Sequence, residues 1–231
     1  METHKTGCII CGRELQYFQQ KKTMRCEVCG VEFESAASCT DNHFVCDECH
    51  SRPGQAVITS MALRTPGRNP ITIAEEMMKN SIINMHGPEH HYLVIAALLA
   101  AFKNSGGYVE MESALSLARQ RSEKVPGGVC GFWGSCGAGI GTGIFMSIIT
   151  GATPLSVKQW QLANKMTSLS LEAISENGGP RCCKRDTLLA ILTAIDFVKE
   201  KISIEMDKPE IVKCSFHHNN PSCKKDSCVF F

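Results

Sequence analysis

The chain has 231 residues, of which 43% are hydrophobic, and 24 Lys and Arg residues nearly balance 23 Asp and Glu residues. This composition excludes an intrinsically disordered chain and a protein that binds nucleic acid through a high overall positive charge. The unusual feature is the presence of 14 cysteines. The first residues lack the apolar stretch of a secretory signal, so we expect a cytoplasmic protein whose cysteines bind metals or react as thiols.

Residues 1–52 contain half of these cysteines and little apolar periodicity, which predicts a zinc-ribbon-like module that folds around metal. Cys-x2-Cys pairs are typical of tetrahedral zinc sites, and eight residues provide ligands for two such sites. They are Cys8, Cys11, Cys26, Cys29, Cys39, His43, Cys46 and Cys49, with His50 as an alternative to His43. The sequence does not decide whether the ligand pairs fill the sites in sequential or in crossed order.

After a predicted linker at residues 53–70, a helical catalytic domain is predicted at residues 71–205. Its apolar periodicity and its start and stop signals predict helices at 71–83, 88–103, 111–124, 138–149, 156–177 and 180–201. The segments HYLVIAALLAAF and IGTGIFMSIIT are apolar on nearly all sides, so they belong at the centre of a bundle, and both are too short to cross a membrane. The glycines in GAGIGTG favour close helix packing over phosphate binding, because no P-loop lysine and no strand accompany them.

Three of the predicted helices begin with a glycine- or proline-rich turn that carries reactive side chains. The turns are HGPEHH at 86–91, CGFWGSCG at 130–137 and GGPRCCKRD at 178–186. An ordinary helix start explains any one of them, but three together favour function, because helix amino termini stabilise thiolates and bound anions. The predicted catalytic residues are Glu89 and His90, as proton-transferring groups, and Cys182 and Cys183, as thiols. The predicted substrate-binding residues are Arg181, Lys184 and Arg185.

The tail, residues 206–231, contains Cys214, Cys223 and Cys228 and no apolar periodicity, which predicts a loop held by metal. Three cysteines suit a [4Fe-4S] cluster that leaves one iron open to substrate, and Cys130 and Cys136 are alternative ligands. Zinc bound with the help of His217 or His218 is a second interpretation, which the sequence leaves open. The predicted fold is therefore mainly α: a helical bundle between a zinc module and a cysteine-rich tail.

The segments GFWGSCGAGIGTGIFMSIITGATPLS and NGGPRCCKRDTLLAI resemble a prokaryotic family of unknown function, common in anaerobes and methanogens, in which cysteine knuckles precede a cysteine-rich helical domain. The resemblance covers nearly the whole chain. More distantly, the CGAGIG helix and the GGPRCCK helix start are similar to iron-sulfur cysteine desulfidases and to the α-part of iron-sulfur serine dehydratases. This similarity implies an all-helical enzyme with a three-cysteine [4Fe-4S] cluster, although this chain has Gly87 or Pro88, beside His86, where those enzymes carry a cysteine.

The leading hypothesis from the sequence is an iron-sulfur-dependent enzyme of sulfur chemistry, which desulfurises a small thiol or passes sulfur from a small donor to an acceptor. The zinc module would contact an RNA or protein acceptor, although Arg13, Lys21, Lys22 and Arg25 form only a weak basic footprint. The alternatives are a metal-binding or redox-sensing adaptor for a protein or RNA partner, and an iron-sulfur lyase or dehydratase for a small hydroxy acid. The substrate, the acceptor and the oligomeric state stay open.

Overall fold

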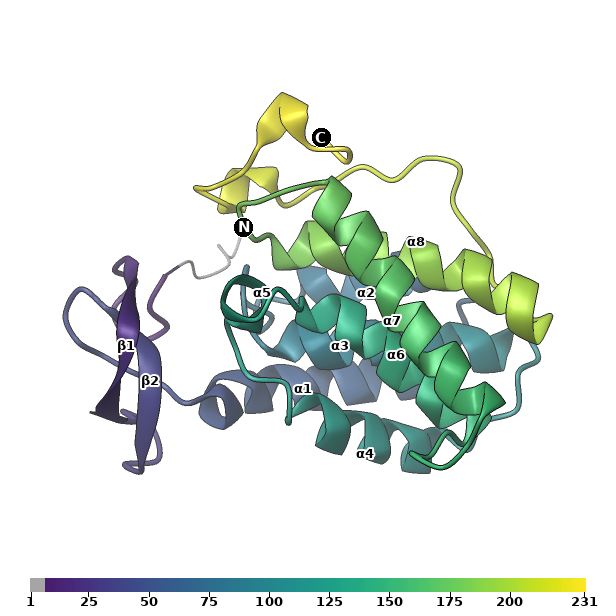
Figure 1. The fold of residues 1–231 in the computed structure, drawn as a ribbon. Helices are drawn as coiled ribbons and strands as arrows, with labels where there is room; N and C mark the ends of the chain where they lie inside the picture. The colour runs from purple at the N-terminus through teal and green to yellow at the C-terminus, as the bar shows by residue number, and fades with distance from the viewer. Residues whose placement is uncertain (1–6) are drawn as a thin grey trace.

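The computed structural model describes residues 7–231, which form a two-stranded module, a bundle of helices and an irregular tail (Figure 1). In the module, β1 (Leu15–Arg25) and β2 (Glu32–Cys39) are antiparallel, with Leu15 paired to Cys39 and Arg25 paired to Glu32. Most side chains of β1 are exposed, and β2 buries only Ser38 and Cys39 at its end, so the hairpin has little apolar core of its own. The mainly helical fold with a small cysteine-rich module at its start is as predicted.

The segment predicted as a linker is largely helical, because α1 (Asp47–Arg64) continues from the module into the bundle. Pro53 and Gly54 both disfavour the interior of a helix, which is why the sequence predicts a break there. Packing outweighs this preference, since Ile58 is fully buried and a Cβ added at Gly54 would lie 3.1 Å from the Ile83 side chain. The module and the bundle therefore share one continuous helix.

All six predicted helices are present, with shifted ends. They are α2 (Pro70–Lys79), α3 (Glu89–Asn104), α4 (Met111–Ser122), α6 (Gly137–Thr150), α7 (Lys158–Glu176) and α8 (Cys183–Ile202), and a short α5 (Val129–Phe132) precedes α6. The largest shift is at the end of α2, where the Asn80 side chain accepts a hydrogen bond from the Ile82 N–H and turns the chain. None of the helices in the described part of the chain is long and apolar enough to span a membrane.

The apolar helix α3 lies at the centre of the bundle, in contact with α1, α2, α4, α6 and α8 (Figure 1). Helix α6 packs unusually close to its neighbours because of its glycines. A Cβ at Gly137 would lie 2.2 Å from the His91 ring on α3, and one at Gly143 would lie 1.8 Å from Thr167 Oγ1 on α7. The predicted packing role of these glycines is confirmed.

The tail, yellow in Figure 1, returns along α8 toward the start of that helix. It contains two single turns, η1 (His217–Asn219) and η2 (Lys225–Ser227). The side chains of Phe216 and Phe230 are buried against the apolar core of the bundle. The tail is thus anchored to the bundle by apolar packing.

Candidate metal centres and pocket

Two groups of four side chains in the module bring their donor atoms within 4.8 Å of one another. Cys8, Cys11, Cys39 and His43 form the first group, and Cys26, Cys29, Cys46 and Cys49 form the second. The ligand pairs are therefore used in crossed order, first with third and second with fourth. The strand register explains the crossing, because the pairing of Leu15 with Cys39 returns the end of β2 to the first cysteine pair.

The distances within each group fit one tetrahedral ion. Cys11 Sγ lies 3.8 Å from Cys39 Sγ, and Cys29 Sγ lies 3.9 Å from Cys46 Sγ. Sulfurs bound at about 2.3 Å to a single tetrahedral ion are about 3.8 Å apart. His43 completes the first group through Nδ1, which is 3.3 Å from Cys11 Sγ, so His50 is not needed as its replacement.

Backbone N–H groups and burial act in opposite directions on the sulfurs of the second group. Burial alone would raise the pKa of Cys26, but the N–H groups of Cys29, Cys46 and Val28 lower it to about 6. Burial raises the pKa of Cys46 to about 12. The lowered pKa of Cys26 beside the raised pKa of Cys46 is compatible with thiols that share a metal ion.

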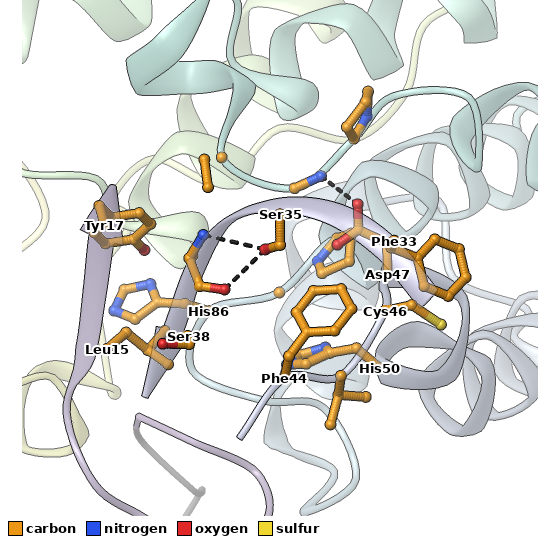
Figure 2. Close-up of a pocket in the computed structure, with 18 of the residues that line it drawn as sticks. Leu15, Tyr17, Phe33, Ser35, Ser38, Phe44, Cys46, Asp47, His50 and His86 are labelled. Atoms are coloured by element: carbon orange, nitrogen blue, oxygen red, sulfur yellow. Dashed lines mark hydrogen bonds between the residues drawn. The ribbon is translucent and has the colours of Figure 1, made fainter. Parts of the chain in front are cut away.

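A cavity of about 580 Å³ lies between the module and the starts of the bundle helices. Figure 2 shows the rings of Tyr17, Phe33 and Phe44 and the imidazoles of His50 and His86 around it. Both its volume and its mixture of aromatic and polar groups are typical of sites for small molecules. We call this cavity the main pocket.

The three reactive helix starts meet beside the main pocket. The start of α3 lines it with His86 and Gly87, and the residues before α8 contribute Arg181. The Gly87 N–H donates to Cys183 Sγ, which joins the starts of α3 and α8. The Cys136 thiol at the start of α6 lies 3.8 Å from Asp186 Oδ2 in the first turn of α8. The structure therefore brings together residues from turns that are nearly 100 positions apart in the sequence.

Glu89 and His90, the predicted proton-transferring residues, are buried and do not line the main pocket. Glu89 Oε1 accepts from the backbone N–H and the side-chain amide of Asn84, and Oε2 lies 3.5 Å from His50 Nδ1. Burial alone would raise the pKa of Glu89, but the contact with His50 outweighs it and the pKa falls to about 2. Burial holds the pKa of His90 well below its usual value, so its imidazole is neutral.

His86, which was not among the predicted catalytic residues, does line the main pocket. Asn220 Oδ1 accepts from the Ser222 N–H, so it is an oxygen, and His86 Nε2, 3.4 Å away, must donate to it. The ring proton is therefore on Nε2, and Nδ1 keeps a lone pair. Nδ1 is a buried atom without a hydrogen-bond partner. Burial, reinforced by the charge of Arg181, lowers the pKa of His86 to about 4, so the imidazole is neutral near pH 7.

The three predicted substrate-binding cations have different environments. Lys184 is buried and donates to the Asn84 carbonyl, and Arg185 is buried in an ion pair with Asp186. Arg181 lines the main pocket, with its guanidinium over the Tyr17 ring, and makes no ion pair with any described residue. Of the three cations, Arg181 alone is free to meet an anion in the main pocket.

Burial opposes the activation that the sequence predicts for three thiols of the helix starts. Burial raises the pKa of Cys136 and of Cys183 to about 12, and it raises the pKa of Cys182 as well. The loss of hydration outweighs the helix terminus and the neighbouring arginines. The raised pKa values of these three cysteines oppose the formation of thiolates near neutral pH.

A second, smaller cavity lies where the tail meets the start of α8, and we call it the tail cavity. Its lining includes four cysteines, Cys182, Cys214, Cys223 and Cys228. Cys130 and Cys136, the predicted alternative ligands, do not line it. The grouping of Cys182 with the tail links residues that no local spacing in the sequence connects.

The comparisons with known proteins bear on the bundle and the tail. A model of the family of unknown function DUF5714 matches residues 58–231. The chain belongs to this family. The same comparisons found no curated protein and no solved structure that matches the chain. Membership in a family of unknown function is thus as predicted, while the more distant similarity to desulfidases and dehydratases stays a prediction. The matched range begins within α1 and contains all the residues that line the tail cavity.

Proposed function

We propose that this protein is an iron-sulfur-dependent enzyme of sulfur chemistry that releases sulfide from a small thiol bearing a carboxylate. The observation that carries the proposal is the position of Asn220 between the two cavities. Its Oδ1 accepts from His86, in the wall of the main pocket, and its Nδ2 lies 3.7 Å from Cys182 Sγ, in the wall of the tail cavity. A group bound among the cysteines is therefore next to the side chains that would handle a substrate.

The metal of the module in this proposal is zinc. Its two closed four-ligand groups, one of four cysteines and one of three cysteines with a histidine, match the ligand sets that structural zinc sites use. Such sites leave no position for a substrate, so the zinc ions hold the hairpin that forms one wall of the main pocket. The reducing cytoplasm, where thiols stay free for metals, is the compartment that suits these ligands.

The cysteines of the tail cavity are the proposed ligands of a [4Fe-4S] cluster, with Cys214, Cys223 and Cys228 as predicted from the sequence. Thiolate donors are the usual ligands of such clusters. When bound, the cluster supplies a Lewis-acidic iron atom with affinity for sulfur. The bundle supplies the positive groups that an anionic cluster needs, because α8 begins at this cavity and the buried Lys184 ammonium interacts with Cys182 and Cys214.

The side chains of the main pocket account for binding and proton transfer. Arg181 pairs with the substrate carboxylate, because its guanidinium has no other anionic partner among the described residues. The neutral imidazole of His86, which lines the main pocket, is the base that accepts the proton from the carbon next to that carboxylate. The electron pair of this C–H bond forms a carbon–carbon double bond, and the sulfur leaves as hydrosulfide when the C–S bond breaks. Glu89 and His90, which are buried outside the lining of the main pocket, act as positioning residues.

The raised pKa of Cys183 disfavours transfer of sulfur through a persulfide on this residue and so supports elimination. A persulfide carrier must attack as a thiolate, and a thiol with a pKa of about 12 is almost entirely protonated near pH 7. Elimination requires no protein nucleophile and no added oxidant. Release of sulfide is therefore the form of sulfur chemistry that these residues favour.

Anaerobic purification with assays of iron, acid-labile sulfide and sulfide release tests the proposal. We expect brown protein that releases sulfide from L-cysteine or 3-mercaptopropionate and not from 2-mercaptoethanol, which lacks the carboxylate. Arg181→Gln should abolish the release, while Lys21→Gln, which removes another cation of the same cavity, should not. A colourless protein that contains only zinc and releases no sulfide would favour the adaptor alternative.

A further inference from the structure

We infer that Cys182 is the fourth protein ligand of the tail cavity, so that Cys182, Cys214, Cys223 and Cys228 form one four-cysteine cluster site. The inference rests on the proposed function, because it concerns the cluster assigned there. It replaces the open three-cysteine site predicted from the sequence. The argument uses the lining of the cavity, the N–H donors around the sulfurs, their spacing and the nearby charge.

The lining of the cavity separates Cys182 from its neighbour Cys183. Cys182 lines the tail cavity, whereas the Cys183 sulfur receives the N–H of Gly87 on the side of α3. This agrees with the rotation of about 100° between successive residues of a helix. Of the seven cysteines beyond α1, four line the tail cavity, and Cys130, Cys136 and Cys183 do not.

The sulfurs of the tail cavity have N–H donors like those of the module. The N–H of Phe216 lies 3.3 Å from Cys214 Sγ, and the N–H of Lys225 lies 3.4 Å from Cys223 Sγ. Both donors are two residues after the cysteine, as is Val28, which donates to the metal-site residue Cys26 at 3.5 Å. Asn220 Nδ2 is the donor toward Cys182. Donors of this kind stabilise thiolates and tune bound clusters.

The spacing of the sulfurs points to a cluster rather than to a single ion. Among residues 7–231, groups of donors that lie within 4.8 Å of one another occur only in the module. The four sulfurs of the tail cavity are therefore spread more widely than one tetrahedral ion requires. A [4Fe-4S] cluster binds each cysteine through a different iron atom, so it suits a wider set of sulfurs.

The charges around the cavity suit an anionic cluster with four thiolates. The charge of Arg185, which lines the cavity, is offset by its ion pair with Asp186, but the start of α8 brings the positive end of a helix to Cys182. The buried ammonium of Lys184 interacts electrostatically with Cys182 and Cys214. These positive groups offset the charge that four thiolates would bring into a largely buried site.

Four protein ligands also change how a substrate reaches the iron. A cluster held by Cys182, Cys214, Cys223 and Cys228 would offer no iron atom to a substrate unless one of these cysteines released it. Cys182 is the ligand connected to the main pocket, through Asn220 and His86. It is therefore the ligand that a substrate thiolate would replace.

The adjacent cysteines provide a matched test in the full-length protein, reconstituted without oxygen from iron and sulfide. We expect Cys182→Ala to lose most of the bound iron, acid-labile sulfide and visible absorption, as Cys214→Ala should, and Cys183→Ala to keep them. In Cys182→Ala, 2-mercaptoethanol should restore the cluster by supplying an external thiolate. Unchanged zinc content and an unchanged circular dichroism spectrum would show that the variants fold. If Cys182→Ala does not fold, Cys182→Ser takes its place in the test.

Two results would overturn the inference, and they are distinguishable. If Cys182→Ala retains as much cluster as Cys183→Ala, Cys182 is not a ligand, while the proposed enzyme with three cysteine ligands stands. If the unmodified protein itself binds no iron under these conditions, the cluster assignment and the proposed function fail together.

Discussion

The module and the tail cavity each gather four ligands, but by different means. In the module, the ligands come from a segment of about 40 residues, and their sulfurs are close enough for single ions. At the tail cavity, α8 supplies one cysteine and the tail supplies three, at wider spacing, with Phe216 and Phe230 buried beside them. The comparison indicates that the module depends on its metals to fold, whereas the tail cavity depends on the folded bundle. The spacing of the sulfurs, more than their number, separates the two kinds of site.

The largest effect is expected when the crossed pairing of the module is broken. Cys11→Ala combined with Cys39→Ala should remove one zinc, because both residues belong to the first group. Cys11→Ala combined with Cys29→Ala should remove both zinc ions and unfold the module, since a structural zinc contributes about 10–16 kcal/mol of apparent binding free energy. Zinc content measured by mass spectrometry and circular dichroism checks this. Loss of one zinc in the second double variant would instead indicate sequential pairing.

A smaller effect should follow from breaking the bundle next to the tail cavity. Asp186→Ala leaves the buried Arg185 guanidinium without its ion-pair partner, which should lower the free energy of unfolding by about 3–5 kcal/mol. Urea unfolding followed by circular dichroism measures this effect. Asp196→Ala is the control, because Asp196 lies on the same helix in an exposed pair with Lys208 and should change little.

The same variant sharpens the comparison between the two regions. Because Asp186 is in the first turn of α8, its loss should lower the iron content of the tail cavity and leave both zinc ions in the module. Loss of zinc together with iron would mean that metal binding in the module depends on the stability of the bundle next to the tail cavity.

Acid should weaken the bundle through His86 in a window set by its pKa. The pKa of His86 is about 4 in the folded protein, against an ordinary value of about 6.5, so the unfolded chain binds the proton more readily. The stability that depends on neutral His86 is present above pH 6.5 and is lost as the pH falls toward 4. Between pH 7 and pH 5 the loss should be about 2 kcal/mol.

His86→Gln separates this contribution from the release of zinc, which acid also promotes. Both proteins should lose zinc at the same pH, but the variant should lack the additional loss of about 2 kcal/mol in the urea-unfolding free energy. Equal acid sensitivity of the two proteins would show that His86 does not titrate as described.

The smallest effect is expected at the residue that joins the two cavities. Asn220→Ala removes the acceptor for His86 Nε2 and should cost about 1 kcal/mol of stability. Imidazole nitrogen shifts measured by nuclear magnetic resonance should show His86 in one tautomer in the unmodified protein and in both tautomers in the variant. A single tautomer that persists in Asn220→Ala would assign its control to another group.

The sequence predicts local features of this molecule well, because their signals are local. The eight ligands of the module follow from the spacing of cysteines and His43, and the six helices follow from apolar periodicity and from the glycine- and proline-containing turns that bound several of them. The central position of α3 follows from its apolar composition. In each of these cases the residues that carry the signal are near one another in the chain.

Features that depend on distant contacts could not be predicted in the same way. The crossed pairing depends on the register of β1 with β2. The continuity of α1 through Gly54 depends on packing that outweighs the low helix propensity of glycine. The grouping of Cys182 with the tail depends on the return of the chain along α8. The role of His86 depends on Asn220, which lies 134 positions later in the sequence.

The continuity of α1 makes the metal affinity of the module a property of the whole protein. Cys46 caps this helix and Cys49 lies in its first turn, while Ile58 and Ala62 on later turns are buried in the bundle. Ordering the first turn costs conformational entropy, which an isolated module must supply from metal binding and the intact protein has already supplied through packing. By thermodynamic linkage, zinc bound at one end of α1 and packing at the other strengthen each other. A fragment that ends within α1 should accordingly bind its second zinc more weakly than the intact chain.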